Sequence, residues 1–220
     1  RCCIVSKLVT NGCSMTWGSG LNPDTRVVDA YPYKLAKLLD AELFDLSKPG
    51  HSGQYVVRTT IDFFLERLDE DLSEYIVLLQ LPDGSRFEYW DDYKLIWEQI
   101  MPAHHDVKDF AIMFGSQKWN VYNTTNNIIQ IGNFLKENNI RYYISTDDES
   151  FENLSKEDDI AKRRIEYINT NYSILGGQID NSSLVGKEVK AREVIIPGDG
   201  HLSEYGHTVA ANNIYRLIND

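Results

Sequence analysis

Apolar runs of strand length alternate along the chain with longer segments whose apolar positions recur at helical spacing. The short runs span residues 4–10, 42–46, 75–81, 141–145 and 194–196. The longer segments span residues 27–39, 56–68, 93–100, 124–138 and 160–168, and a terminal helix is expected after residue 201. This alternation is typical of a parallel sheet with helices on both faces. We therefore predict an α/β fold, a three-layer α/β/α sandwich with a flavodoxin-like, five-stranded parallel sheet.

The chain of 220 residues has a length that one domain can accommodate, and no linker-like stretch divides it. We therefore predict a single domain over residues 1–220. Residues 88–117 are rich in aromatic side chains and are predicted to form an insertion that shapes a pocket wall. Residues 147–190 are polar, and we expect them to be mobile or to form a lid.

The composition of the chain argues against two classes of binding partner, nucleic acids and membranes. A formal net charge of −11 disfavours nucleic acid, which binds mainly through Lys and Arg. No apolar run approaches the roughly 20 residues that span a bilayer, so no membrane partner is expected. The three cysteines suggest neither a disulfide framework nor a zinc site, and a reducing, cytoplasmic location is the expectation. Because the chain begins with Arg1, the sequence leaves open whether an N-terminal segment has been removed. It also leaves the oligomeric state open.

The first apolar run ends in a turn that delivers a serine. Gly12 stops the run and Ser14 follows two residues later, where an open α/β sheet binds ligands beyond the carboxyl ends of its strands. A glycine–x–serine turn alone is more often structural. Asp199 and His201, near the other end of the chain, supply the base and carboxylate that a nucleophilic serine needs. His207 is a rival base, although its position in the terminal helix favours packing.

Taken together, Gly12-Cys13-Ser14, the Gly50 turn and Asp199-Gly200-His201 followed by Gly206-His207 resemble the SGNH hydrolase superfamily, also called GDSL esterases and lipases. The resemblance implies that Ser14 is the nucleophile, His201 the base and Asp199 its partner. It also implies that the backbone N–H groups of Ser14 and Gly50 hold the oxyanion. No cofactor is expected.

The chain departs from the family pattern at three positions. Cys13 stands where the family has the Asp of Gly-Asp-Ser, and Asp199 lies two residues before His201 instead of three. Pro82 stands where an asparagine donates to the oxyanion, and proline offers no donor. We expect Ser85 or Arg86, in the same loop, to supply a third donor, although Asp83 and Arg86 could instead form a solvated ion pair.

The family's common small substrates are acyl esters, which include O-acetyl groups on carbohydrates. Trp17, Tyr89 and Trp90 lie near predicted loop edges. Two roles stay open for these side chains, packing in the core and stacking on a sugar. We predict a serine esterase acting on a small carbohydrate ester, with Trp17, Ser85 and Tyr89 binding substrate. The alternatives are a hydrolase-fold protein that binds a glycan or partner without turnover, and acyl transfer to another hydroxyl. No metal is expected, because the adjacent histidines at 104 and 105 lack a third ligand.

Overall fold

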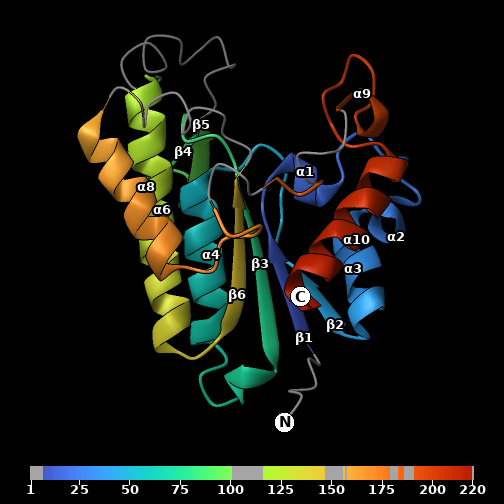
Figure 1. Ribbon diagram of the computed structural model, residues 1–220, viewed down its shortest axis with the longest axis horizontal. Helices are drawn as coiled ribbons and strands as arrows, with labels where there is room; N and C mark the ends of the chain where they lie inside the picture. The colour runs from blue at the N-terminus through green and yellow to red at the C-terminus, as the bar shows by residue number, and fades with distance from the viewer. Residues whose placement is uncertain are drawn as a thin grey trace.

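The computed structural model describes residues 7–100, 116–146, 156, 158–178, 183–185 and 191–219 (Figure 1). Its central sheet has the strand order β2-β1-β3-β6, and every neighbouring pair is parallel. The strands are β1 (Lys7–Asn11), β2 (Glu42–Asp45), β3 (Tyr75–Leu81) and β6 (Arg141–Thr146). The strand β3 is buried along its whole length, as its continuous apolar run predicts.

Helices cover both faces of this sheet (Figure 1). One face carries α4 (Gly53–Leu65), α6 (Gln117–Glu137) and α8 (Asp159–Asn171), and the other carries α3 (Tyr31–Leu39) and α10 (Glu204–Asn219). Two apolar clusters fill the space between the layers, one on each face. Alternate residues of β3 belong to one cluster or the other, because successive side chains of a strand point to opposite faces. The predicted α/β/α fold class is thus confirmed.

The prediction of five strands is wrong for the described residues, which form four strands in the parallel sheet. The run at 194–196 was expected to be the fifth. Instead α9 (Ala191–Val194) ends there, and Ile195 makes only an isolated antiparallel bridge with Leu202. The chain reverses at once into the following turn, so the run is too short to pair with the sheet. Beyond β6, Ile174 makes a single parallel bridge to Ile144.

The helix predicted over 27–39 is two helices, α2 (Arg26–Asp29) and α3. Ala30 between them is extended, with ψ of 147°. Pro32 explains the break, because its ring would clash with the carbonyl four residues earlier in a continuous helix.

The helical piece predicted over 93–100 is also wrong. The segment belongs to an antiparallel hairpin formed by β4 (Phe87–Asp91) and β5 (Ile96–Ile100). The Asp91 carboxylate accepts hydrogen bonds from the backbone N–H groups of Tyr93 and Lys94, which closes the turn. Cross-strand pairing of β-forming aromatic residues therefore overrides the helical spacing. The rest of the predicted insertion, residues 101–115, lies outside the described residues.

Because the strands are parallel, their carboxyl ends lie at the same edge of the sheet. The segment that follows β2 runs alongside the turn after β1, since Leu46 N donates to Thr10 O at 2.8 Å and Lys48 N donates to Gly12 O at 3.1 Å. The short helix α1 (Ser14–Trp17) begins directly beyond this point. The loops after β1, β2 and β3 thus lie at one edge of the sheet, where open α/β sheets bind ligands.

Candidate active site

Ser14 lies where the sequence predicts it, at the first position of α1 and immediately past the end of β1. The turn that delivers it requires glycine at position 12. A Cβ on Gly12 would lie 2.2 Å from Thr16 Oγ1 and 3.0 Å from Gln80 Oε1, closer than real contacts allow. Ser14 is half-buried, and Cys13 before it is buried. The serine therefore reaches the edge of the sheet while the residue beside it packs inside.

Asp199 and His201 form a hydrogen-bonded pair, in which His201 Nδ1 contacts Asp199 Oδ1. The two-residue spacing works because Gly200 between them adopts a φ of 86°, a region that favours glycine. The backbone is held in turn by a hydrogen bond from Ile196 N to His201 O at 2.8 Å. The side chains of His201 and Asp199 are 29% and 40% exposed. Since Nδ1 faces the carboxylate, Nε2 is the nitrogen left for proton transfer.

The Asp199–His201 pair lies against the segment that follows Ser14. A Cβ on Gly20 would be 3.1 Å from Asp199 Oδ2 and 3.5 Å from His201 Cβ. Figure 1 shows the chain between α9 and α10 on the same side of the sheet as α1. The segment that carries Asp199 and His201 therefore packs against the residues that follow α1.

Ser14 and His201 are not hydrogen-bonded to each other among the described residues. The Ser14 hydroxyl instead points to Cys13 Sγ, at 3.9 Å. Catalytic hydrogen bonds are often long or misaligned before a substrate binds. The described structure therefore shows Ser14 and His201 without a hydrogen bond between them.

Gly50 lies in the loop after β2 and has a φ of 77°. Within the described part of the chain, no hydrogen bond from the backbone N–H groups of Gly50 or Ser14 is found. The next residue, His51, bonds through Nδ1 to Pro49 O at 2.9 Å and packs on the ring of Tyr55. Burial lowers the pKa of His51. The loop therefore presents the Gly50 N–H, which is unpaired among the described residues, beside a histidine that favours its neutral form.

The loop after β3 has a buried Pro82, so it lacks the family's asparagine donor. Asp83 caps this loop by accepting a hydrogen bond from Ser85 N at 2.6 Å. No Asp83–Arg86 ion pair is found among the described residues. Arg86 instead directs Nη1 to His51 O, at 3.5 Å. This contact brings the guanidinium to the Gly50 loop, and Ser85 stays half-buried beside it.

The hairpin β4–β5 is attached to the start of α4 by a buried polar network. Arg58 donates through Nε and Nη2 to the two carboxylate oxygens of Glu88, each at 2.9 Å. Gln99 Nε2 also donates to Glu88 Oε2, at 3.1 Å, and Ser52 N donates to Gln99 Oε1 at 3.0 Å. The Glu88 side chain is only 4% exposed. The hairpin is therefore fixed against the residue that caps α4, two positions after Gly50.

The predicted aromatic contacts have different surroundings. Tyr89 on β4 is 46% exposed, and Trp90 and Trp97 pair edge-to-face with ring centroids 5.7 Å apart. The Arg26 guanidinium covers Trp17, 3.6 Å from its ring centroid. Tyr89 and Trp90 thus offer accessible aromatic surface, whereas one face of Trp17 is already occupied.

His207, the rival base, is fully buried at the start of α10. Its Nδ1 accepts a hydrogen bond from Tyr31 N at 3.1 Å, and its ring stacks on that of Tyr31. Burial, aided by the charge of Lys34, lowers the pKa of His207 to about 4. Since His207 Nε2 is buried and has no hydrogen-bond partner among the described residues, it provides no path there for a proton to Ser14.

Gln80 is the site residue that the sequence reasoning missed. It is buried in β3, and its Oε1 accepts hydrogen bonds from Cys13 N at 3.3 Å and Cys13 Sγ at 3.2 Å. The available signal was a polar residue inside the otherwise apolar run at 75–81. A glutamine in such a buried strand requires a polar partner.

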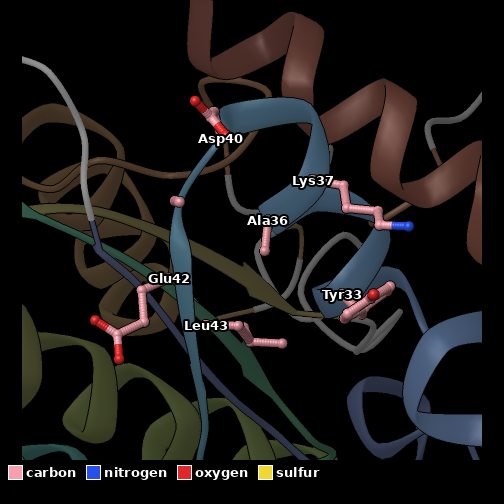
Figure 2. A pocket seen from close by; sticks show the side chains of 7 residues that line it. Tyr33, Ala36, Lys37, Asp40, Glu42 and Leu43 are labelled. Atoms are coloured by element: carbon pink, nitrogen blue, oxygen red, sulfur yellow. The ribbon is translucent and has the colours of Figure 1, made fainter.

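Three further findings concern the molecule outside this site. No cluster of three metal-ligating side chains occurs within the described ranges, and the histidines at 104 and 105 fall outside them. A hollow between the end of α3 and the start of β2 is lined by Tyr33, Lys37 and Glu42, among others (Figure 2). Glu42 pairs with Lys7 at the amino end of β1, so this hollow lies at the opposite edge of the sheet from Ser14. Among the described helices, none is long and apolar enough to cross a bilayer.

Comparisons with known proteins begin with sequence. No family model matches the chain. Part of it is similar to 3-dehydroquinate synthases, with 30% identity over 92 residues to the Pseudomonas entomophila protein and 34% over 90 residues to that of Pseudomonas syringae pv. syringae. These matches cover 39% of this chain and 25% and 24% of those proteins, so the chain spans about a quarter of the length of the curated relatives it matches.

Similarity to solved structures extends over nearly the whole chain. A putative lipolytic protein of the G-D-S-L family from Desulfitobacterium hafniense aligns with a TM-score of 0.58 and 12% identity, covering 96% of this chain and 99% of that one. An acetylxylan esterase from Geobacillus stearothermophilus, solved as a catalytic mutant, gives 0.56 and 12%, covering 98% and 94%. The esterase EstA from Pseudoalteromonas sp. gives 0.54 and 12%, covering 97% of each chain. The chain therefore has the α/β/α fold of these solved hydrolases, at low sequence identity.

Proposed function

We propose that this protein is a serine esterase or deacylase that removes small acyl groups, foremost O-acetyl groups on a carbohydrate, through an acyl-enzyme. What supports the proposal is the position of Ser14 at the start of α1, past the carboxyl end of β1, together with a hydrogen-bonded Asp199–His201 pair that lies against Gly20 in the segment after α1. A serine becomes nucleophilic when a base accepts its proton and a carboxylate orients that base.

In the proposed reaction, Ser14 Oγ attacks the ester carbonyl and His201 Nε2 accepts the hydroxyl proton. The tetrahedral oxyanion collapses, the C–O bond to the alcohol breaks, and His201 returns the proton to the leaving alcohol. Water, deprotonated by His201, then attacks the acyl carbonyl; the acyl–Ser14 bond breaks, His201 returns the proton to Ser14 Oγ, and the acid is released. For the first step, the Ser14 hydroxyl must turn from Cys13 Sγ to His201, which substrate binding would drive.

The oxyanion donors in this proposal are the backbone N–H groups of Ser14 and Gly50. Both lack a partner within the described residues, and the N–H of Ser14 belongs to the first turn of a helix, where donors have no intrahelical acceptor. Arg86 is the proposed third donor in place of the asparagine that Pro82 replaces. Its contact with His51 O puts the guanidinium one residue from Gly50. Loss of one oxyanion donor costs about 10²–10³-fold in turnover, so Arg86 sets how efficient the enzyme is.

The proposed substrate class rests on the surroundings of this edge. Tyr89 and Trp90 expose aromatic surface on a hairpin that is fixed next to the Gly50 loop, and aromatic rings suit the apolar faces of sugars. Trp17 and Ser85 remain proposed contacts at the same edge. The presence of an acetylxylan esterase among the structural neighbours supports this substrate class.

The test is labelling with a fluorophosphonate, followed by mass-spectrometric mapping of the modified residue. We expect modification at Ser14 in the wild type and none in the Ser14→Ala or His201→Ala protein. Hydrolysis of p-nitrophenyl acetate and of acetylated xylo-oligosaccharides then identifies the substrate class. Labelling at a different residue, or equal labelling without His201, contradicts the mechanism.

A second candidate function is glycan binding without turnover. The observation that favours it is the Ser14 hydroxyl pointing to Cys13 and not to His201, together with Pro82 in the oxyanion loop. A binder predicts glycan affinity that is unchanged in Ser14→Ala and no labelling of the wild type. Acyl transfer to a second hydroxyl uses the same residues, and it is distinguished by adding an alcohol acceptor and measuring the transferred acyl group.

A further inference from the structure

A buried hydrogen-bond network lies directly beneath the turn that carries Ser14. Its centre is Gln80 Oε1, which accepts from Cys13 N at 3.3 Å, from Cys13 Sγ at 3.2 Å and from Thr16 Oγ1 at 3.4 Å. Thr16 also bonds to the hydroxyl of Tyr31, at 3.0 Å. Every one of these residues is at most 3% exposed. The network therefore joins β3, the Ser14 turn and α3 through direct side-chain contacts.

The register of the sheet explains why Gln80 reaches this turn. Asn11, the last residue of β1, pairs with Leu79, so Gln80 is the first residue of β3 beyond the end of β1. Its side chain shares the face of Ile76 and Leu78, the face that α3 and α10 cover. Gln80 therefore points into the space that the chain enters after β1 ends, where an apolar residue would leave Cys13 N unsatisfied.

We propose that Gln80 is a positioning residue, which sets the direction of the Ser14 hydroxyl by holding the residues on either side of it. Cys13 precedes Ser14 and Thr16 follows it by two positions, and both are bound by the same amide oxygen. Cys13 also contacts Ser14 Oγ through the thiol that donates to Gln80. Through these contacts Gln80 acts on the nucleophile without touching the substrate. This inference rests on the proposed esterase function for its kinetic consequence only.

The inference can be tested by substitutions that remove or keep the acceptor oxygen of Gln80. Gln80→Leu removes the acceptor at nearly constant volume and leaves the Cys13 N–H and the Thr16 hydroxyl without that partner. Gln80→Glu keeps an oxygen acceptor at the same place. Thr16→Val removes one donor and leaves Gln80 with the other contacts. The matched control is Gln130→Leu, the same change on the exposed side of α6.

The first measurement is the rate constant of fluorophosphonate labelling at Ser14, together with kcat and KM for p-nitrophenyl acetate. A displacement of about 1 Å at a reacting group can cost 10²-fold, so we expect Gln80→Leu to lower the labelling rate and kcat by about that factor. KM should change little, because the substrate contacts are intact. Gln80→Glu should recover part of the rate, Thr16→Val should lose less than Gln80→Leu, and Gln130→Leu should match the wild type.

The second measurement is independent of activity: amide hydrogen exchange of a peptide covering residues 11–18. We expect faster exchange there in Gln80→Leu than in the wild type, with unchanged exchange in peptides from α8. If the wild type is not labelled at all, the proposed function fails, and the exchange comparison still decides whether Gln80 holds the turn. A folded Gln80→Leu protein with wild-type exchange at 11–18 overturns the inference, as does one labelled at the wild-type rate. Should Gln80→Leu not fold, the same two criteria apply to Thr16→Val.

Discussion

Protonation of the buried His207 should make the protein less stable in acid. In the folded state its Nδ1 accepts a hydrogen bond from Tyr31 N, which requires the neutral ring, and the imidazole is fully buried. Burial, with the nearby charge of Lys34, lowers the pKa from the ordinary value of 6.5 to about 4, while Asp29 opposes the shift. Between these two values the unfolded chain binds the proton more readily than the folded protein does.

The sign and size of the effect follow from linkage. A histidine whose pKa is lowered by folding contributes its full stability above pH 6.5, and that contribution declines as the pH falls toward 4. One pKa unit corresponds to about 1.4 kcal/mol, so His207 accounts for a loss of about 3 kcal/mol in the free energy of unfolding across this window. Such a loss is a large share of the 5–15 kcal/mol that is typical of a domain.

The assay is urea unfolding of the wild type and of His207→Asn at several pH values between 7.5 and 4. Asparagine can still accept from Tyr31 N through Oδ1 but does not titrate. The wild type should lose about 3 kcal/mol more than the variant over this range. His51, whose pKa burial also lowers, acts in the same direction in both proteins and cancels in the comparison. Parallel loss of stability in the two proteins would refute the reasoning.

Three further outcomes are expected. Arg58→Met should destabilise the protein by about 3–5 kcal/mol in urea unfolding, because it strands the nearly buried carboxylate of Glu88, and a second change, Glu88→Gln, should restore much of the loss. Gly84→Ala should lower the free energy of unfolding by about 1–3 kcal/mol, since its Cβ would lie 2.2 Å from a backbone oxygen of α6. It should also slow labelling at Ser14. An unchanged melting temperature would contradict this prediction. Ser14→Ala and His201→Ala should each abolish ester hydrolysis yet melt like the wild type, and a large drop in melting temperature would argue for a structural role.

Two wrong predictions show how tertiary context overrides local signals. Residues 93–100 carry apolar side chains at helical spacing, yet they form part of a hairpin because Glu88 and Gln99 have buried partners on α4. The run at 194–196 has strand composition, but Ile195 makes only an isolated antiparallel bridge with Leu202, because the chain reverses between them. In the hairpin, contacts with residues far away in the sequence decided the structure.

The candidate site likewise contains residues that the sequence could identify and one, Gln80, whose contacts it could not. Ser14, Gly50, Asp199 and His201 could be proposed from their order along the chain, because a parallel sheet brings the carboxyl ends of its strands to one edge. Gln80 could not be assigned a partner from sequence, since its contact with Cys13 depends on β3 extending one residue beyond β1.

By itself the sequence determined the layered α/β/α architecture and the position of Ser14 just past the end of the first strand. Hydrophobic periodicity is a local property, and it fixes which elements form and which faces they bury. Only the tertiary structure decided that Asp199 reaches His201 across a two-residue spacing, that Ser14 points to Cys13, and that Arg86 turns to the Gly50 loop and not to Asp83. These are directions of side chains within a few ångströms, and they are set by packing between segments that the chain brings together only on folding.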